Sequence, residues 1–137
     1  MSTSYGPSVN LEQAKKVLSA AEAEAVKQGW NVAIAVVDTA GNLVGFIKRD
    51  DTQSASVRVA QDKARTAALY RRPSKAFQDM VAGGGLGLRV MTMRDVVAAE
   101  GGVPLVAGGQ IIGAVGVSGV NSDQDGVVAS AGAAALV

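Results

Sequence analysis

The chain has 137 residues, the usual length of one folded domain, and folding at this size buries about two thirds of the unfolded chain's surface. Its formal charge is +1 with acidic and basic residues interspersed, so no basic stripe is available to bind nucleic acid. It contains neither cysteine nor histidine, which excludes disulfides, cysteine nucleophiles, Ser-His-Asp triads and ordinary zinc sites.

The first ten residues do not have the pattern of a signal peptide. Residues 1–10 lack the charged start and the apolar block of a signal peptide, and no apolar run in the chain is long enough to cross a bilayer. We therefore expect residues 1–137 to form a single cytoplasmic domain that does not interact with membranes.

The first elements along the chain are a helix and a strand hairpin. Asn10 and Gln13 have the form of a capping box, and apolar residues then repeat at helical spacing until Gly29 ends the helix. The run 32–37 is apolar and β-branched, which is typical of a strand covered on both faces. A polar turn follows it, so 43–48 is predicted to be the returning antiparallel strand.

A second and a third helix are predicted next. Small residues repeat along one face of 54–70, which allows this helix to lie close to the sheet until Pro73 ends it. Ser74 can cap a short helix that continues to about Met80. Because consecutive glycines do not hold a regular element without partners, Gly83–Gly87 is predicted to be a loop or a lid.

The last third of the chain predicts three short strands and a helix. The strands are expected at 96–99, 103–106 and 111–117, with paired glycines in the turns between them. Connections this short require antiparallel pairing, since a parallel crossover needs about a dozen or more residues. The Ala-rich segment 123–136 is helical in propensity, with Ser122 or Asp123 as its cap.

Short motifs occur along nearly the whole chain in a fixed order. They are 37–43, Arg49-Asp50, 63–67, Pro73-Ser74, 101–104, 112–119 and 123–132. In this order they resemble the GlcG/HbpS family, whose members are described as haem-binding proteins or as accessory proteins of small-acid catabolism. The same domain occurs at the carboxyl end of some PduO corrinoid adenosyltransferases.

The resemblance implies a fold, an assembly and a ligand. The fold is an α+β, profilin-like, three-layer arrangement in which helices flank a five-stranded, mostly antiparallel sheet, and the assembly is a homo-oligomer. Haem or another tetrapyrrole is the implied ligand and cofactor. Because histidine and cysteine are missing, an axial ligand would come from Tyr70, Met91, Met93, Thr66 or a neighbouring subunit. Met91 and Met93 are also readily interpreted as packing residues.

The candidate ligand-binding residues lie at two places in the first half of the chain. Lys63, Arg65 and Thr66 lie on the second predicted helix, where Lys63 or Arg65 would hold a carboxylate or propionate unless both are solvated helix charges. Arg49 and Asp50 follow the second strand directly. The planar guanidinium of Arg49 suits a ligand carboxylate, although an ordinary strand-end ion pair is the competing interpretation.

Further candidates lie in the second half of the chain. Ser118 and Gly119 end an apolar strand and could present backbone N–H groups to an anion, or form only a turn. Glu100 is the candidate catalytic residue, since partial burial would let it transfer a proton, and the alternative is a solvated turn residue. Asp123 and Asp125 lack the rest of a calcium loop, so we expect helix capping there and no metal site.

Three functional hypotheses remain open at this stage. The first is a non-catalytic protein that binds a small anionic compound or a tetrapyrrole in a homo-oligomer. The second is an enzyme of small organic acid catabolism, isomerase-like or tautomerase-like, in which Glu100 moves a proton while Arg49 and Lys63 hold the substrate. The third is a purely structural assembly subunit. The two active hypotheses require these charged residues to converge on one cavity.

Overall fold

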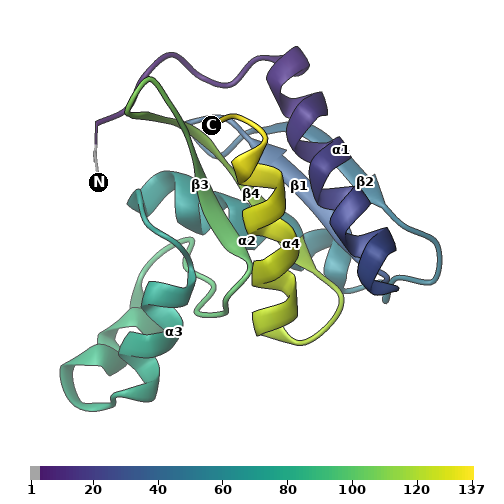
Figure 1. The fold of residues 1–137 in the computed structure, drawn as a ribbon. Coiled ribbons are helices and arrows are strands. Elements are labelled where there is room, and N and C mark those ends of the chain that lie inside the picture. The colour runs from purple at the N-terminus through teal and green to yellow at the C-terminus, as the bar shows by residue number, and fades with distance from the viewer. Residues whose placement is uncertain (1–3) are drawn as a thin grey trace.

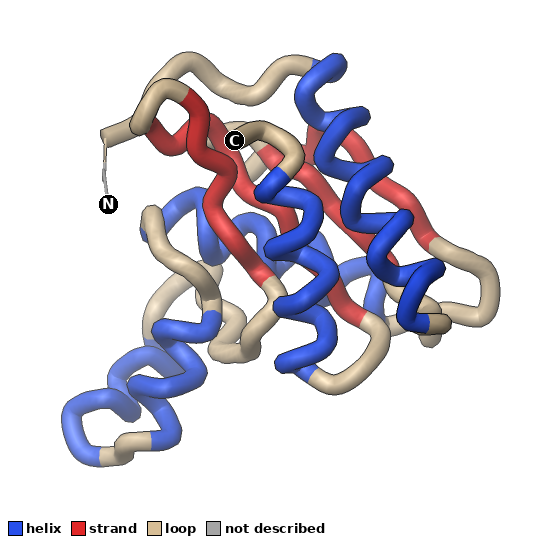
Figure 2. The backbone as a smooth tube through the Cα atoms, in the orientation of Figure 1, coloured by secondary structure: helices blue, strands red, loops and turns tan. Residues whose placement is uncertain are grey.

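The computed structural model describes residues 4–137 and shows helices packed on both faces of one antiparallel sheet (Figure 1). Figure 2 shows the same chain coloured by helix and strand. The elements are α1 (Leu11–Gln28), β1 (Ala33–Val37), β2 (Leu43–Lys48), α2 (Ser56–Tyr70), α3 (Lys75–Ala82), the 3-10 helix η1 (Gly85–Thr92), β3 (Gly102–Ala107), β4 (Gln110–Ser118) and α4 (Ser122–Ala134).

The sheet has four strands in the order β2-β1-β4-β3, and every neighbouring pair is antiparallel. The predicted antiparallel sheet is therefore confirmed, but the predicted fifth strand at 96–99 is wrong. The Val97 N–H donates to the Thr66 hydroxyl of α2 at 2.9 Å, where a strand would need a ladder partner. The segment is apolar and β-branched, yet it lies against a helix.

Two apolar layers fill the space between the sheet and the helices. One side chain set of β1 and β4, including Ile34, Val36 and Val115, packs with α1 and α4. The alternate set, including Ala33 and Ala35, packs against the small residues of α2. This alternation follows from the period of two along a strand, and it gives the three-layer arrangement of helix, sheet and helix.

One of the three predicted helix caps forms as the sequence indicates. Asn10 and Gln13 form the predicted reciprocal capping box at α1, with bonds of 3.0 and 2.8 Å. At α4 the cap is Asn121, one residue before the predicted one, and its N–H donates to the Gln124 side chain at 3.1 Å. Ser74 makes no side-chain cap bond to α3. Its hydroxyl is used elsewhere, as described below.

Residues 71–94 form an arm that projects away from the sheet (Figure 1). The arm consists of α3 and η1, so the glycine-rich segment predicted to be a loop is partly helical. A Cβ on Gly87 would lie 1.9 Å from the Met80 carbonyl oxygen, which shows that glycine is needed for η1 to approach α3. Within residues 4–137, no helix combines the length and apolar character needed to span a membrane.

Candidate functional site

A buried ion pair lies at the end of the sheet where β4 finishes. The Lys63 Nζ atom is 2.9 Å from Asp125 Oδ2 and donates to the Val117 carbonyl at 3.1 Å, with only 3% and 2% of the two residues exposed. Burial raises the pKa of the Asp125 carboxyl, and the Lys63 ammonium opposes this rise. The pair joins α2 to α4, which cover opposite faces of the sheet.

The glycine pair before β3 makes room for this lysine. A Cβ on Gly102 would lie 2.1 Å from the Lys63 carbonyl oxygen, and one on Gly101 would lie 2.9 Å from Lys63 Nζ. Any side chain at either position would displace the backbone of α2 or the ammonium group. Gly101 and Gly102 were expected only to form a turn between strands. Their lack of side chains also lets Lys63 pass over them to reach Asp125 of α4.

Ser74 and Gln78 fix the backbone that leads into this glycine pair. The Ser74 N–H donates to the Gly102 carbonyl at 3.0 Å, and the Ser74 hydroxyl accepts from the Gly102 N–H at 2.9 Å. The same hydroxyl donates to the Ala99 carbonyl at 2.6 Å. The Glu100 N–H donates to the Gln78 side chain at 2.8 Å. Glu100 is thus held between two anchored neighbours.

The Glu100 side chain lines a pocket of about 240 Å³. A Cβ on Gly126 of α4 would lie 2.4 Å from Glu100 Oε2, so the carboxylate lies directly against a helix position that has no side chain. Lys75 lines the same pocket, and its ammonium is 2.7 Å from Asp79 Oδ2. The lining residues are Pro73, Lys75, Glu100, Gly101, Gly102, Val103, Gly126 and Ser130.

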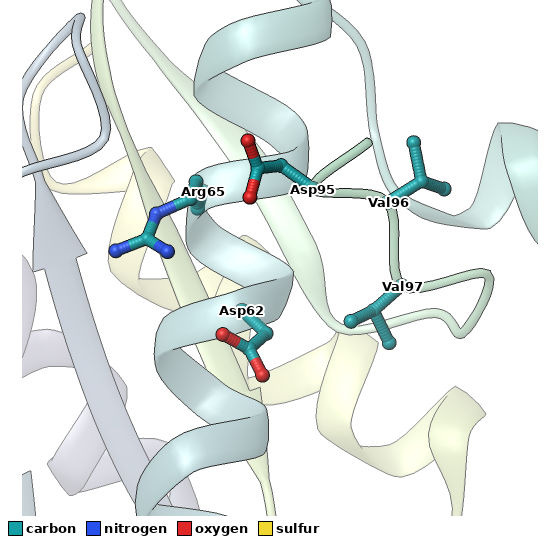
Figure 3. Close-up of a pocket in the computed structure, with 5 residues that line it drawn as sticks. All are labelled: Asp62, Arg65, Asp95, Val96 and Val97. Atoms are coloured by element: carbon teal, nitrogen blue, oxygen red, sulfur yellow. The ribbon is translucent and has the colours of Figure 1, made fainter. Parts of the chain in front are cut away.

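A second pocket of about 210 Å³ lies between α2 and the segment that follows the arm (Figure 3). Asp62, Arg65 and Asp95 contribute two carboxylates and one guanidinium, and Val96 and Val97 complete the lining. Its formal charge is therefore negative. This sign disfavours the organic anion that the sequence assigned to Arg65.

Thr66 holds the outer wall of that second pocket. Its hydroxyl lies 2.8 Å from the Asp62 carbonyl and 3.1 Å from the Asp95 carbonyl, and it accepts the Val97 N–H. Thr66 is fully buried, so its side chain has no direct access to a ligand. In this structure it positions Asp95 and Val97.

Arg49 and Asp50 lie away from both pockets. The Arg49 guanidinium is 2.6 Å from Glu22 of α1, which is the strand-end ion pair considered from the sequence. Asp50 is exposed. Arg49 follows the edge strand β2, whereas Glu100 precedes β3 at the opposite edge of the sheet. The hypothesis of a proton-transfer enzyme requires Arg49, Lys63 and Glu100 to converge on one cavity. They do not.

Ser118 and Gly119 form a closed end of β4. The Ser118 hydroxyl is buried and lies 3.0 Å from the Ser56 hydroxyl. A Cβ on Gly119 would lie 2.3 Å from the Asn31 carbonyl oxygen. The next backbone N–H, that of Val120, donates to the Asp125 carboxylate of α4 at 3.1 Å. This N–H is therefore already bonded to a carboxylate of the protein.

The arm exposes three large apolar side chains of η1. Leu86, Leu88 and Met91 of η1 are 79%, 49% and 73% exposed. Residues three apart share a face of a 3-10 helix, so Leu88 and Met91 lie on one face while Arg89 lies beside Leu86 on the next. The interpretation of Met91 as a packing residue is wrong.

Comparison with known proteins identifies the chain over most of its length. Residues 9–134 match the family described as haem degrading protein, HbpS-like. The chain belongs to the HbpS-like family. Its match to Protein GlcG of Escherichia coli K12 is 44% identical over 110 residues, which are 80% of this chain and 81% of GlcG.

Solved structures of HbpS-like proteins share the fold. A double mutant of Streptomyces reticuli HbpS has a TM-score of 0.87 at 30% identity, covering 98% of this chain and 90% of that one. A PduOC complex with haem has a TM-score of 0.83 at 27% identity, covering 93% of this chain and 94% of that one. The family resemblance inferred from the short motifs is confirmed.

Three of the motifs that carry the HbpS-like resemblance meet at one end of the sheet. Lys63, Pro73-Ser74 and Gly101-Gly102 come from different elements, yet they contact one another around the Glu100 pocket. Sequence reasoning found Lys63 and Glu100 but interpreted Asp125 as a helix cap and did not single out Gly126. A buried carboxylate 62 residues away from its lysine has no local signal.

Proposed function

We propose that this HbpS-like chain is a small-ligand-binding protein that takes haem or another tetrapyrrole on the arm, in a homo-oligomer. The observation that carries the proposal is the apolar surface of Leu86, Leu88 and Met91 beside exposed Arg89 and Arg94. The haem complex of the similar PduOC chain and the family's description support this ligand class.

The sizes of the two pockets that contain Glu100 and Arg65 favour the arm over either of them as the tetrapyrrole site. Ligand pockets usually measure about 300–1,000 Å³. The Glu100 and Arg65 pockets, at about 240 and 210 Å³, are both smaller than this. A flat macrocycle fits an open apolar surface better than it fits either cavity.

The charge of the arm also suits a tetrapyrrole. Residues 71–94 carry five cations and one acid, for a net charge of +4, which leaves −3 for the rest of a chain whose total is +1. The side chains of Leu86, Leu88 and Met91 would contact the rings, and the guanidinium groups of Arg89 and Arg94 would bind the propionates.

Met91 is the best placed of the predicted axial ligands. Thr66 is buried and holds the 95–97 segment. The Tyr70 hydroxyl donates to the Arg94 carbonyl at 2.5 Å, and so anchors the arm. Haem, when bound, would supply an iron whose reactivity depends on its axial ligand and the polarity around it. The exposed thioether of Met91 provides a soft ligand on the proposed surface.

The homo-oligomer follows from the geometry of the ligand. A single arm presents one surface, whereas a macrocycle has two apolar faces that both need cover from water. A second copy of the chain, with its own cationic and apolar arm, would cover the other face. This accounts for a protein that exposes large apolar side chains on a projecting element.

The test is a spectroscopic haem titration of the purified chain, with the molar mass measured before and after. We expect a saturable Soret shift and an increase in mass. Met91→Leu should change the Soret position while binding survives, and Leu88→Ser should weaken binding. Leu11→Ser, which alters a leucine 55% exposed on α1, is the matched control and should bind as the parent does. A titration without saturation would refute the proposal.

A further inference from the structure

The Glu100 pocket contains a carboxylate that lacks a partner. Among residues 4–137, no hydrogen bond or ion pair is made by the Glu100 side chain, whereas its backbone N–H is bonded to Gln78. The neighbouring Lys75 is held mainly by Asp79 and is attracted more weakly by Glu100, and both effects raise its pKa. Lys63, just beneath, is committed to Asp125.

The charges around this pocket therefore leave one negative group unbalanced. Lys75 with Asp79 and Lys63 with Asp125 form two neutral pairs, and Glu100 remains. A half-buried carboxylate is best satisfied by a cation that carries N–H donors, because charge-assisted hydrogen bonds are the strongest available to it. The Ser130 hydroxyl lines the same pocket and offers a further acceptor.

We propose that the Glu100 pocket binds a small protonated amine, at a site separate from the tetrapyrrole surface of the arm. The pocket volume of about 240 Å³ corresponds to roughly eight water volumes, which limits the ligand to about eight non-hydrogen atoms. Pro73, Val103 and the glycines form the remaining walls, so the non-polar part of the ligand is a short aliphatic chain.

Gly126 determines where the carboxylate points. The three atoms nearest to a Cβ at this helix position all belong to the Glu100 side chain, with Oε2 at 2.4 Å and Cδ and Cγ at 3.0 Å. Because alanine favours a helix interior by about 1 kcal/mol over glycine, Gly126→Ala should leave α4 intact. It should nevertheless push the carboxylate away from its present position, and so impair amine binding without unfolding the protein.

The experiment titrates the full chain with n-butylammonium, 1-butanol or butyrate and follows the backbone amide NMR signals of Gly101, Gly102 and Gly126. We expect saturable shifts of these signals with n-butylammonium, and little change with the neutral 1-butanol or the anionic butyrate. Glu100→Gln should weaken amine binding about tenfold or more, as expected for loss of a hydrogen bond to a charged group. Gly126→Ala should weaken it similarly, while Glu12→Gln, which removes an exposed carboxylate of α1 outside the pocket, should retain it.

Three results would overturn this proposal. They are the absence of shifts with n-butylammonium, equal shifts with 1-butanol or butyrate, and undiminished amine binding in Glu100→Gln. A haem titration of Glu100→Gln separates the two sites, because it should match that of the parent chain. Loss of haem binding in an arm variant that still binds the amine would likewise affect only the tetrapyrrole proposal.

Discussion

The sheet end and the arm use charge and apolar surface in opposite ways. At the sheet end, Lys63 and Asp125 are buried together and tied to a main-chain carbonyl, and glycines bring the surrounding backbone into close contact. On the arm, Leu86 and Met91 face solvent and the arginines are exposed. Lys63 and Asp125 are thus paired with each other inside the protein, whereas the arm exposes the apolar side chains that we assign to a tetrapyrrole.

This difference shows that a charged residue in a family motif can have a structural role. Lys63 was a candidate for gripping a ligand, yet its contacts are those of a structural strut between α2 and α4. The arm held the weaker sequence signals, namely glycines and alternating methionines, and it carries the surface we assign to the ligand. Substitutions of the Lys63–Asp125 pair should therefore cost stability, and those of the exposed apolar residues on the arm should affect tetrapyrrole binding.

The largest expected effect is that of Lys63→Met. It leaves a buried carboxylate without its cation, and breaking one side of such a pair costs about 3–5 kcal/mol in the free energy of unfolding. Urea unfolding at pH 7 measures this. The double variant Lys63→Met with Asp125→Asn should recover much of the loss, since no unpaired charge remains buried. An equal loss of unfolding free energy in the single and double variants would contradict a structural role for the ion pair.

The pH dependence of Lys63→Met gives a second test of the same pair. Burial already raises the pKa of Asp125, and removing the opposing ammonium should raise it further. When the pKa of a carboxyl is higher in the folded than in the unfolded state, the protein loses stability as the pH rises through that range. The deficit of the variant relative to the parent should therefore be smallest near about pH 4 and largest at pH 7. A deficit that is independent of pH would contradict this assignment.

Glycine-to-alanine substitutions compare the two regions directly. Gly102→Ala would place a methyl group 2.1 Å from the Lys63 carbonyl oxygen, and overpacking of this kind costs about 1–3 kcal/mol or more. Gly83→Ala, at φ −73° on the arm with its nearest neighbour at 3.6 Å, should stabilise the fold by about 0.4–1 kcal/mol. Thermal unfolding of both variants would measure these changes in stability. A Gly102→Ala variant as stable as the parent would contradict the close packing of Gly102 against the Lys63 carbonyl.

The smallest effect on stability is expected for Leu86→Ser. Because this side chain is 79% exposed, its loss should change the free energy of unfolding by less than about 0.5 kcal/mol. The same variant should weaken haem binding in the titration. Large destabilisation without ligand would mean that the arm is covered by another part of the protein, and not by a tetrapyrrole.

Local patterns predicted the secondary structure best where the cause was local. The capping box of Asn10 and Gln13, the hairpin after Val37 and the helix containing Lys63 all depend on neighbours within a few residues, and all are present. The strand at 96–99 failed because its partner, Thr66, lies on a helix some thirty residues away. An apolar β-branched run does not reveal which backbone will pair with it.

The candidate site was predicted only in part for the same reason. Glu100 was singled out and lines a pocket, but its neighbour Gly126 comes from α4 and had no signal of its own. Arg49 and Lys63 were grouped with it by their charge and their place in the family motifs, and the sheet order separates Arg49 from both. Charge identifies candidates, whereas topology decides which of them meet.

The most direct test of the account maps where a tetrapyrrole binds. Metal-free protoporphyrin is titrated into the isotope-labelled chain while the backbone amide signals of all residues are followed. We predict that the perturbed signals lie in η1 and the residues after it, at 85–94, with the Lys63 and Asp125 region unchanged. Perturbations confined to the Glu100 or Arg65 pocket, with the arm unaffected, would contradict the assignment of the tetrapyrrole to the arm.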